Sequence, residues 1–239
     1  MTLWGTVTKV KICGIKDISH AVAAAQFGAD FIGLNFVPSS PRNVDLDRAK
    51  RVISHLHTLP MFEQKPRTVA VFANQPLDLV RSIARQCDVD AVQLSGNESL
   101  AYCSEVGGLI IKAIHVNDDL PKGETITVVR EALAAISSMG YLPLLDNHEF
   151  GVMGGSGQSF DWSIARELAQ DYDFLLAGGL NPENVGQAVS TVLPWGVDVA
   201  SGVETGGDKD VAKIDTFLKN VQAVAPLDYE VQYKKGGLG

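Results

Sequence analysis

Short apolar, β-rich segments alternate with amphipathic segments along almost the whole chain, and this alternation limits the possible folds more than any other feature. The pattern is typical of βα units, in which helices connect parallel strands. Eight strands are predicted, at residues 7–12, 30–36, 67–72, 90–94, 108–114, 141–146, 173–177 and 196–200. Eight such units predict a single (β/α)8 TIM barrel, whose active site lies at the carboxyl ends of the strands.

A doubly wound open sheet is the alternative fold, but no GxGxxG follows the first predicted strand to support it. Composition does not change abruptly before about residue 223, so we expect one barrel domain over residues 1–223. Residues 224–239 are polar and end in glycines, and we expect this tail to be loosely ordered.

Helix boundaries are also predictable from turn residues. The first helix is expected near residues 17–27, ending at Gly28, with a buried face of Ile18, Ala21, Val22 and Ala25. The third should begin after the NQP of residues 74–76. The seventh should begin after NPEN, where Asn181 can cap the helix and Pro182 suits its first position.

Aspartates recur at the start of several predicted strands, which is the stability face of a barrel. We therefore expect structural roles for Asp30, Asp90 and Asp173.

Composition excludes several classes of protein. The 239 residues are 46% hydrophobic, as in a globular chain, and the formal net charge of −8 opposes non-specific binding to nucleic acid. No apolar run approaches the roughly 18 residues of a membrane span. The first ten residues do not resemble a secretory signal, so a cytoplasmic location is expected.

The three cysteines, Cys13, Cys87 and Cys103, form no close pair that would indicate a disulfide framework or zinc site. His55 and His57 would not share a helix face, and no HExxH is present, so no metal site is expected.

Cys13 directly follows the first predicted strand, and two interpretations are open. A buried cysteine is most often an inert core residue. However, strand alternation places Lys9, Lys11 and Cys13 on the inner side of the barrel, and the same parity places Asp146 at the inner end of the sixth strand. Lys11 and the start of the first helix could favour a thiolate, and a thiolate facing an acid suits an isomerisation. Capping of a loop is the alternative role for Asp146.

Glycine-rich segments follow the last three strands: GGSG at residues 154–157, AGGLN at 177–181 and ASGVETGG at 200–207. Backbone N–H groups of such turns can bind anions, and barrels commonly bind phosphate at the loops after strands seven and eight. A small phosphorylated substrate is therefore predicted. The connection from Asn147 to Phe160 exceeds the roughly 2–6 residues usual for βα loops, so we expect a mobile lid that also contacts the phosphate.

Eight motifs together resemble the phosphoribosylanthranilate isomerase family of tryptophan biosynthesis, over residues 9 to about 220. They are KICGI with Cys13, SPR with Arg42, VFANQ, VQLSG, LLDN, GGSGQSFDW, LAGGLNPENV and VDVASGVE. The resemblance implies an Amadori rearrangement of N-(5′-phosphoribosyl)anthranilate to 1-(2-carboxyphenylamino)-1-deoxyribulose 5-phosphate, without a cofactor.

The resemblance also implies roles for single residues. Asp146 matches the general acid, which would protonate the ribose ring oxygen, and Cys13 matches the general base, which would remove the C2′ proton. Arg42 matches the arginine that holds the anthranilate carboxylate. Asp198 matches a substrate-side aspartate, with loop capping as the alternative. The implied substrate site also includes Lys11 and Ser95, and the implied phosphate site is Gly155, Ser156, Gly157, Gly178, Gly179, Ser201 and Gly202.

One position departs from the family pattern, since Ser95 stands where the family commonly has a histidine in VQLHG. By parity Ser95 faces inward. We expect altered substrate packing or pH response and an unchanged reaction.

Three alternatives are open. Related histidine-pathway isomerases resemble a design with two aspartates, and the thiol of Cys13 argues against them. A phosphate-ligand binding protein without turnover would fit the change at Ser95. The chain could also be one domain of a longer polypeptide, beside other tryptophan-pathway domains. The sequence makes no prediction of the oligomeric state.

Overall fold

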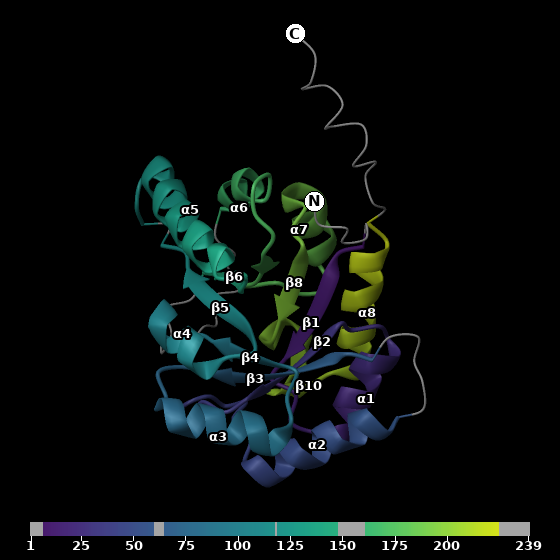
Figure 1. Cartoon of the computed structure of the whole chain (residues 1–239). Coiled ribbons are helices and arrows are strands. Elements are labelled where there is room, and N and C mark those ends of the chain that lie inside the picture. Colours follow the sequence, from purple (N-terminus) through teal and green to yellow (C-terminus); the bar gives the residue numbers. More distant parts are fainter. Residues whose placement is uncertain (1–6, 60–64, 118, 148–160, 225–239) are drawn as a thin grey trace.

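The computed structural model describes residues 7–59, 65–117, 119–147 and 161–224, and its strands form a closed barrel in the order β1 to β8 (Figure 1). All neighbouring strands are parallel, and β8 pairs with β1 to close the ring. The predicted (β/α)8 barrel is therefore confirmed. The strands are β1 Lys9–Cys13, β2 Phe31–Asn35, β3 Arg67–Phe72, β4 Ala91–Leu94, β5 Leu109–His115, β6 Leu142–Asp146, β7 Leu175–Leu176 and β8 Gly196–Val199.

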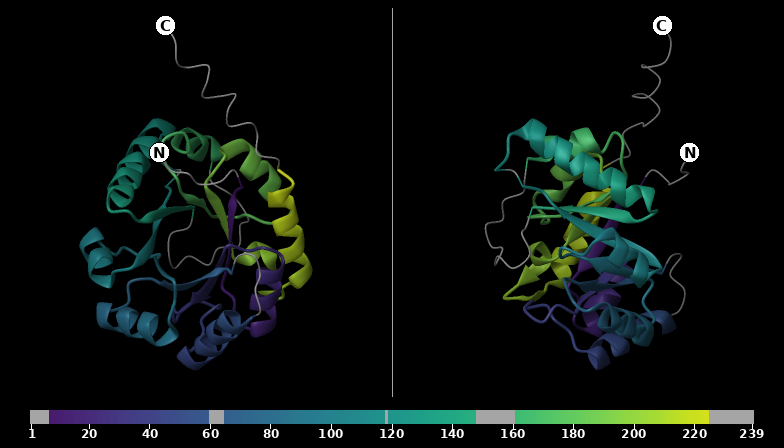
Figure 2. Two further views of the ribbon diagram at one scale, coloured as in Figure 1. Left: turned by 45° about the vertical axis from the view of Figure 1, so that its right-hand side comes forward. Right: turned by 60° about the vertical axis from the view of Figure 1, so that its left-hand side comes forward.

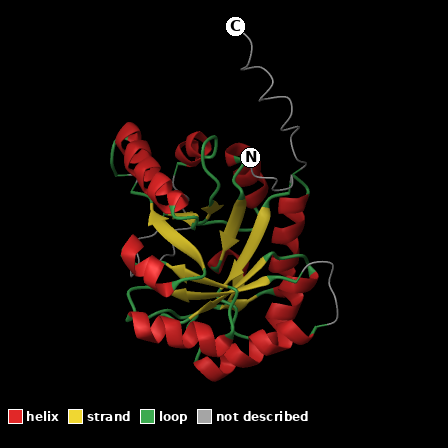
Figure 3. Cartoon of the chain, viewed as in Figure 1, coloured by secondary structure: helices red, strands yellow, loops and turns green. Residues whose placement is uncertain are grey.

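Helices surround the barrel as an outer ring, which is visible in Figure 2 and, by secondary structure, in Figure 3. They are α1 Ile18–Gln26, α2 Leu46–Thr58, α3 Leu77–Cys87, α4 Leu100–Val106, α5 Lys122–Ser138, α6 Trp162–Leu168, α7 Val185–Val192 and α8 Val211–Gln222. After β8 come a short 3-10 helix, η1 (Ser201–Val203), and an antiparallel hairpin of β9 (Glu204–Thr205) and β10 (Asp208–Lys209), which the sequence did not predict. No described helix is long and apolar enough to cross a membrane.

Two apolar layers follow from the alternation of side chains along the strands. Val10 and Ile12 of β1 belong to the large layer between strands and helices, whereas Cys13 belongs to the smaller cluster inside the barrel. Leu144 of β6 and Ala91 of β4 lie in the same inner cluster. The predicted parity of these three strands is therefore confirmed, and it places the inner residues at the strand ends in the barrel mouth.

The predicted buried face of α1 is partly wrong. Ile18 is 37% exposed, and the buried residues of the helix are alanines at positions 21, 23, 24 and 25. Ile18 is the first residue of the helix, whereas the alanines lie in the later turns, and α1 packs against α2, α8 and β2. The predicted stop is confirmed: Gly28 has a φ of +95° and donates a hydrogen bond to the carbonyl of Ala25.

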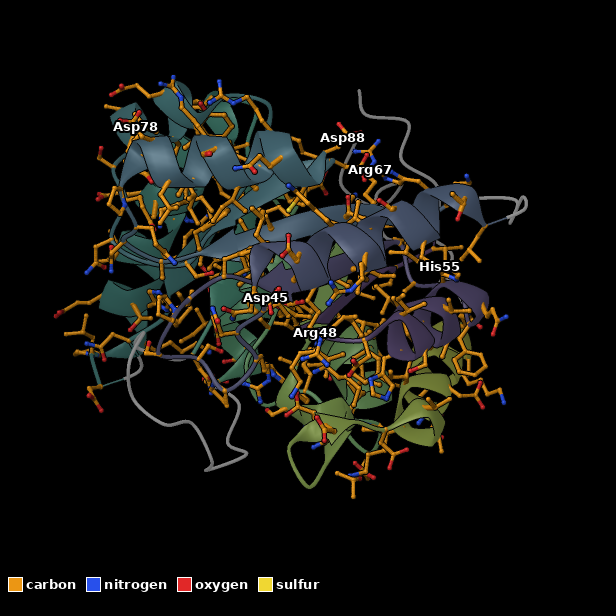
Figure 4. The ribbon with its side chains drawn as sticks, turned by 90° about the horizontal axis from the view of Figure 1, so that it is seen from below. Asp45, Arg48, His55, Arg67, Asp78 and Asp88 are labelled. Carbon is orange, nitrogen blue, oxygen red and sulfur yellow. The ribbon has the colours of Figure 1, made fainter. Side chains whose placement is uncertain are left out.

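The predicted start of the third helix is confirmed, and that of the seventh is displaced by a few residues. α3 begins directly after the NQP segment, and α2 is capped by Asp45, whose carboxylate accepts the N–H of Arg48 at 2.7 Å; both residues are labelled in Figure 4. The side chain of Asn181 accepts the N–H of Asn184 at 2.9 Å and so stabilises the turn that leads into α7. The helix itself begins at Val185, so Pro182 lies in that turn and not at the first helical position.

Aspartates at the strand starts connect neighbouring strands. Asp30 accepts the Lys9 ammonium at 2.8 Å and the backbone N–H of Val10 at 2.9 Å. Asp90 accepts both the N–H and the hydroxyl of Thr68, at 2.7 and 2.8 Å. These contacts confirm structural roles for Asp30 and Asp90. The structural role of Asp173 stays a prediction, as does the domain boundary at residue 223, and the predicted tail lies almost entirely outside the described residues.

Candidate active site

Lys11 is the most buried charged residue of the barrel mouth, with 0% of its surface exposed. Its ammonium donates to a carboxylate oxygen of Asp198 at 2.8 Å, because the register of β1 and β8 places the two residues side by side. Burial acts to lower the pKa of Lys11, but the charges of Asp198 and Cys13 raise it above its ordinary value. Lys11 therefore stays a cation inside the barrel.

Cys13 lies beside this ion pair, close enough for the Lys11 charge to act on its thiol. Burial raises the pKa of Cys13, Lys11 lowers it and Asp198 raises it again, so that the pKa is above its ordinary value. Lys11 therefore acts on the thiol in the predicted direction, but burial and Asp198 outweigh its effect on the pKa. The reason is that Asp198 already balances the Lys11 charge, and α1 begins only at Ile18, beyond the thiol.

Gly33 of β2 makes the room for this group. Its register partner on β1 is Cys13, and a Cβ atom at position 33 would lie 2.9 Å from the Cys13 sulfur and 3.3 Å from the Lys11 nitrogen. Any larger residue would displace the thiol or the ammonium. Glycine at this point therefore sets the position of both.

Asp146 ends β6 and is half-buried, with β7 and β8 between its strand and β1. Leu142 and Leu144 of the same strand pack inside the barrel, so alternation directs Asp146 into the mouth as well. Its backbone carbonyl accepts the N–H of Val116 at 2.8 Å. Cys13 and Asp146 thus face the same mouth from different sides, as the sequence predicted.

Arg42 lies directly over Gly14, the residue after Cys13, where a Cβ atom would overlap the arginine side chain. The guanidinium makes a two-point contact with Glu204 of β9: Nε donates to one carboxylate oxygen at 2.7 Å and Nη2 to the other at 2.8 Å. A second cation, Lys209 of β10, donates to the same carboxylate at 2.6 Å and to the carbonyl of Ala200 at 2.7 Å.

These contacts shift the pKa values of the group. Burial would raise the pKa of Glu204, but its hydrogen bonds to Arg42 and Lys209 hold it below the ordinary value. The pKa of Lys209 is lowered, mainly by burial. Sequence reasoning missed roles for Glu204 and Lys209, although Glu204 is the last residue of the VDVASGVE motif.

Loops after β7 and β8 meet at the predicted phosphate site. Gly178 and Gly179 have φ values of +86° and +66°, which favour glycine. Gly202 approaches the carbonyl of Leu180 so closely that a Cβ atom would overlap it. The structure therefore brings Gly202, after β8, against Leu180 and Asn181, which follow Gly178 and Gly179 after β7. Gly155, Ser156, Gly157 and the predicted lid lie outside the described residues.

A further polar group lies at the ends of β4 and β5. Gln93 donates to the hydroxyl of Ser95 at 2.9 Å, and the Nε2 atom of His115 lies 2.9 Å from the carbonyl oxygen of Ser95. Sequence reasoning missed His115 because the fifth strand was predicted to end at residue 114. Ile111 and Ala113 lie in the inner cluster, so alternation along the strand would have placed His115 inside the barrel as well. No three His, Cys, Asp or Glu side chains of the described residues converge as a metal site.

Comparison with known proteins agrees with this geometry. The family model described as N-(5′-phosphoribosyl)anthranilate (PRA) isomerase matches residues 10–220. The N-(5′-phosphoribosyl)anthranilate isomerase of Dehalococcoides mccartyi is 44% identical over 217 residues, which cover 90% of this chain and 95% of that protein. A multifunctional tryptophan biosynthesis protein of Phycomyces blakesleeanus is 33% identical, and the match covers 90% of this chain and 33% of the relative.

Solved structures give the same relation. The phosphoribosyl anthranilate isomerase of Thermotoga maritima superposes with a TM-score of 0.77 at 33% identity, covering 91% of this chain and 100% of that one. A phosphoribosyl anthranilate isomerase in complex with reduced 1-(o-carboxyphenylamino)-1-deoxyribulose 5-phosphate has a TM-score of 0.74 and 31% identity, with the same coverage.

Proposed function

This chain belongs to the N-(5′-phosphoribosyl)anthranilate isomerase family and is an isomerase of tryptophan biosynthesis, and from this premise we propose that Asp146 and Cys13 are the acid and base of its reaction. The observation that carries the proposal is their position: both lie at strand ends, face the barrel mouth and belong to different strands. An acid and a base on separate sides of a pocket suit a reaction that adds one proton and removes another.

The first step is opening of the ribose ring. Asp146, in its protonated form, gives its proton to the ring oxygen, and the bond between that oxygen and C1′ breaks to leave a Schiff base. The second step uses Cys13 as a thiolate. It takes the proton from C2′, and the bonding electrons move toward the nitrogen to give an enolamine, which becomes the ketose when C1′ gains a proton and the C2′ hydroxyl loses one.

Ionisation of Cys13 is the demanding part of this scheme, since burial raises the pKa of its thiol. Lys11 is the strongest influence in the opposite direction. We therefore assign Lys11 to stabilising the thiolate, and Asp198 to holding Lys11 in place through their 2.8 Å contact. In this scheme Asp198 does not act on the substrate itself but through its contact with Lys11.

The substrate carboxylate is assigned to Arg42. Glu204 accepts hydrogen bonds from Nε and Nη2 of Arg42. Because a guanidinium has five N–H donors, further N–H groups of Arg42 are left to bind a ligand. Glu204 and Lys209 thus orient the arginine, and the anthranilate carboxylate binds its free edge. The phosphate is assigned to the loops that carry Gly178, Gly179, Ser201 and Gly202, together with the predicted Gly155, Ser156 and Gly157.

Consumption of fluorescent N-(5′-phosphoribosyl)anthranilate tests the proposal, with Asp146→Asn as the informative variant. The amide keeps the size of the carboxyl group but cannot supply the acid proton, so turnover should fall by about 10²- to 10⁴-fold. Exposed Glu183→Gln is the control and should keep full activity. Near-normal turnover of Asp146→Asn would exclude Asp146 as the acid. A wild-type protein that binds the substrate without converting it would show that the protein does not catalyse this reaction.

The cytoplasmic location and the neighbouring tryptophan-pathway domains stay predictions. The multifunctional Phycomyces relative supports the second, because a segment like this chain forms one third of it.

A further inference from the structure

A polar cluster at the barrel mouth has no role in the proton transfers described above. It consists of Gln93 on β4, Ser95 directly after that strand, and His115 at the end of β5. In the β5–β6 register His115 is the partner of Asp146, so the cluster lies next to the proposed acid. Gln93 is only 5% exposed, although its side chain is polar.

His115 has a defined tautomer in this cluster. Its Nε2 atom lies 2.9 Å from the carbonyl oxygen of Ser95, and a carbonyl only accepts hydrogen bonds, so Nε2 carries the hydrogen. In the neutral ring Nδ1 is then an acceptor. This Nδ1 atom is buried and has no hydrogen-bond partner in the described part of the chain.

Gln93 presents a second atom of the same kind. Its Nε2 donates to the Ser95 hydroxyl at 2.9 Å, which leaves Oε1 buried and, among the described residues, without a partner. An unpaired buried polar atom costs about 1–3 kcal/mol, and folded proteins keep few of them. Two such acceptors in one cluster indicate that a ligand supplies the donors.

The substrate has suitable donors on one part only. Its phosphate and carboxylate are anions at neutral pH and accept hydrogen bonds. Its amine hydrogen lies beside the ortho carboxylate, which can accept it. The ribosyl hydroxyls are the remaining donors, and they adjoin the ring oxygen assigned to Asp146.

We propose that Gln93, Ser95 and His115 form a subsite for the ribosyl hydroxyls, in which His115 Nδ1 accepts a hydrogen bond from one hydroxyl. Gln93 Oε1 accepts a hydrogen bond from a second hydroxyl, and the Ser95 carbonyl fixes the imidazole. This inference rests on the proposed function, because it takes the substrate from it. It makes His115 a substrate-binding residue of this chain.

Two variants of His115 separate its proposed contact with the substrate from its contact with the Ser95 carbonyl. In His115→Gln the amide lies near the Nε2 position, so the contact with Ser95 is kept and the Nδ1 acceptor is lost. In His115→Asn the amide lies near the Nδ1 position, so the acceptor is kept and the contact with Ser95 is lost. Calorimetry with reduced 1-(o-carboxyphenylamino)-1-deoxyribulose 5-phosphate measures binding without turnover, and thermal unfolding confirms that each variant is folded.

We expect His115→Gln to bind this compound about tenfold more weakly and His115→Asn to stay within about threefold of the wild type, as for loss of one hydrogen bond. The opposite order, or two unchanged affinities in a wild type that turns over substrate, would overturn the subsite and leave the proposed function standing. A wild type that neither binds nor converts would overturn both. If His115→Gln does not fold, the 2′-deoxy and 3′-deoxy analogues are measured with the wild type: at least one should bind about tenfold more weakly, and equal binding of both would overturn the subsite.

Discussion

Two opposing influences act on the pKa of the Cys13 thiol. Burial raises the pKa of its thiol, and the Lys11 ammonium lowers it. The Lys11 charge is in turn shared with Asp198 at 2.8 Å. The thiol therefore depends on a neighbour that is already paired, and its pKa lies above the ordinary value.

A pH titration of the unliganded protein should show this directly. Thiolate absorbance in the ultraviolet, taken as the difference from Cys13→Ser, should rise with a midpoint above the ordinary value of about 8.5. Lys11→Met removes the cation and leaves Asp198 uncompensated, so the midpoint should move to still higher pH. Lys16→Met, whose partner is the exposed Asp208, should leave the midpoint unchanged. A lower midpoint in Lys11→Met would contradict the assigned role of Lys11.

The β9–β10 hairpin is the element that connects the loop after β8 to the loop after β2. Glu204 of β9 holds Arg42 and Lys209 together, and its side chain is only 10% exposed. The hairpin is short, and its two strands pair through Glu204 with Lys209 and Thr205 with Asp208. Its position therefore depends on charge pairing more than on sheet formation.

Glu204→Gln should lower the free energy of unfolding by about 3 kcal/mol at pH 7, since it leaves two cations without their carboxylate. The pKa of Glu204 is lowered in the folded state, so this stabilisation is present above its ordinary pKa of about 4.3 and is lost as the pH falls through the lowered value. Urea unfolding of wild type and variant at pH 7 and pH 3 measures the difference. Glu183→Gln is the control, and an equal difference at both pH values would exclude the pairing as its cause.

At the scale of the whole molecule, hydrophobic alternation was sufficient to predict the closed barrel and the inward parity of Cys13 and Asp146. Both features follow from the hydrophobic periodicity, which depends only on residues close together in the sequence. The raised pKa of Cys13 could not be read from the sequence, because it depends on burial and on the Asp198 charge that only the β1–β8 closure places beside Lys11. The Arg42–Glu204 contact was not predicted for the same reason, since it joins loops far apart in sequence.

If the Cys13 thiol at the mouth of the barrel removes the C2′ proton, its loss should appear in the ratio of kcat/KM between wild type and Cys13→Ser. A serine keeps the shape but is a far weaker base at neutral pH, so the ratio should be about 10² to 10⁴. Cys87→Ser, at a buried cysteine of α3, should change kcat/KM by less than about twofold if folded. A Cys13→Ser enzyme with kcat/KM within tenfold of the wild type would show that Cys13 is not the base.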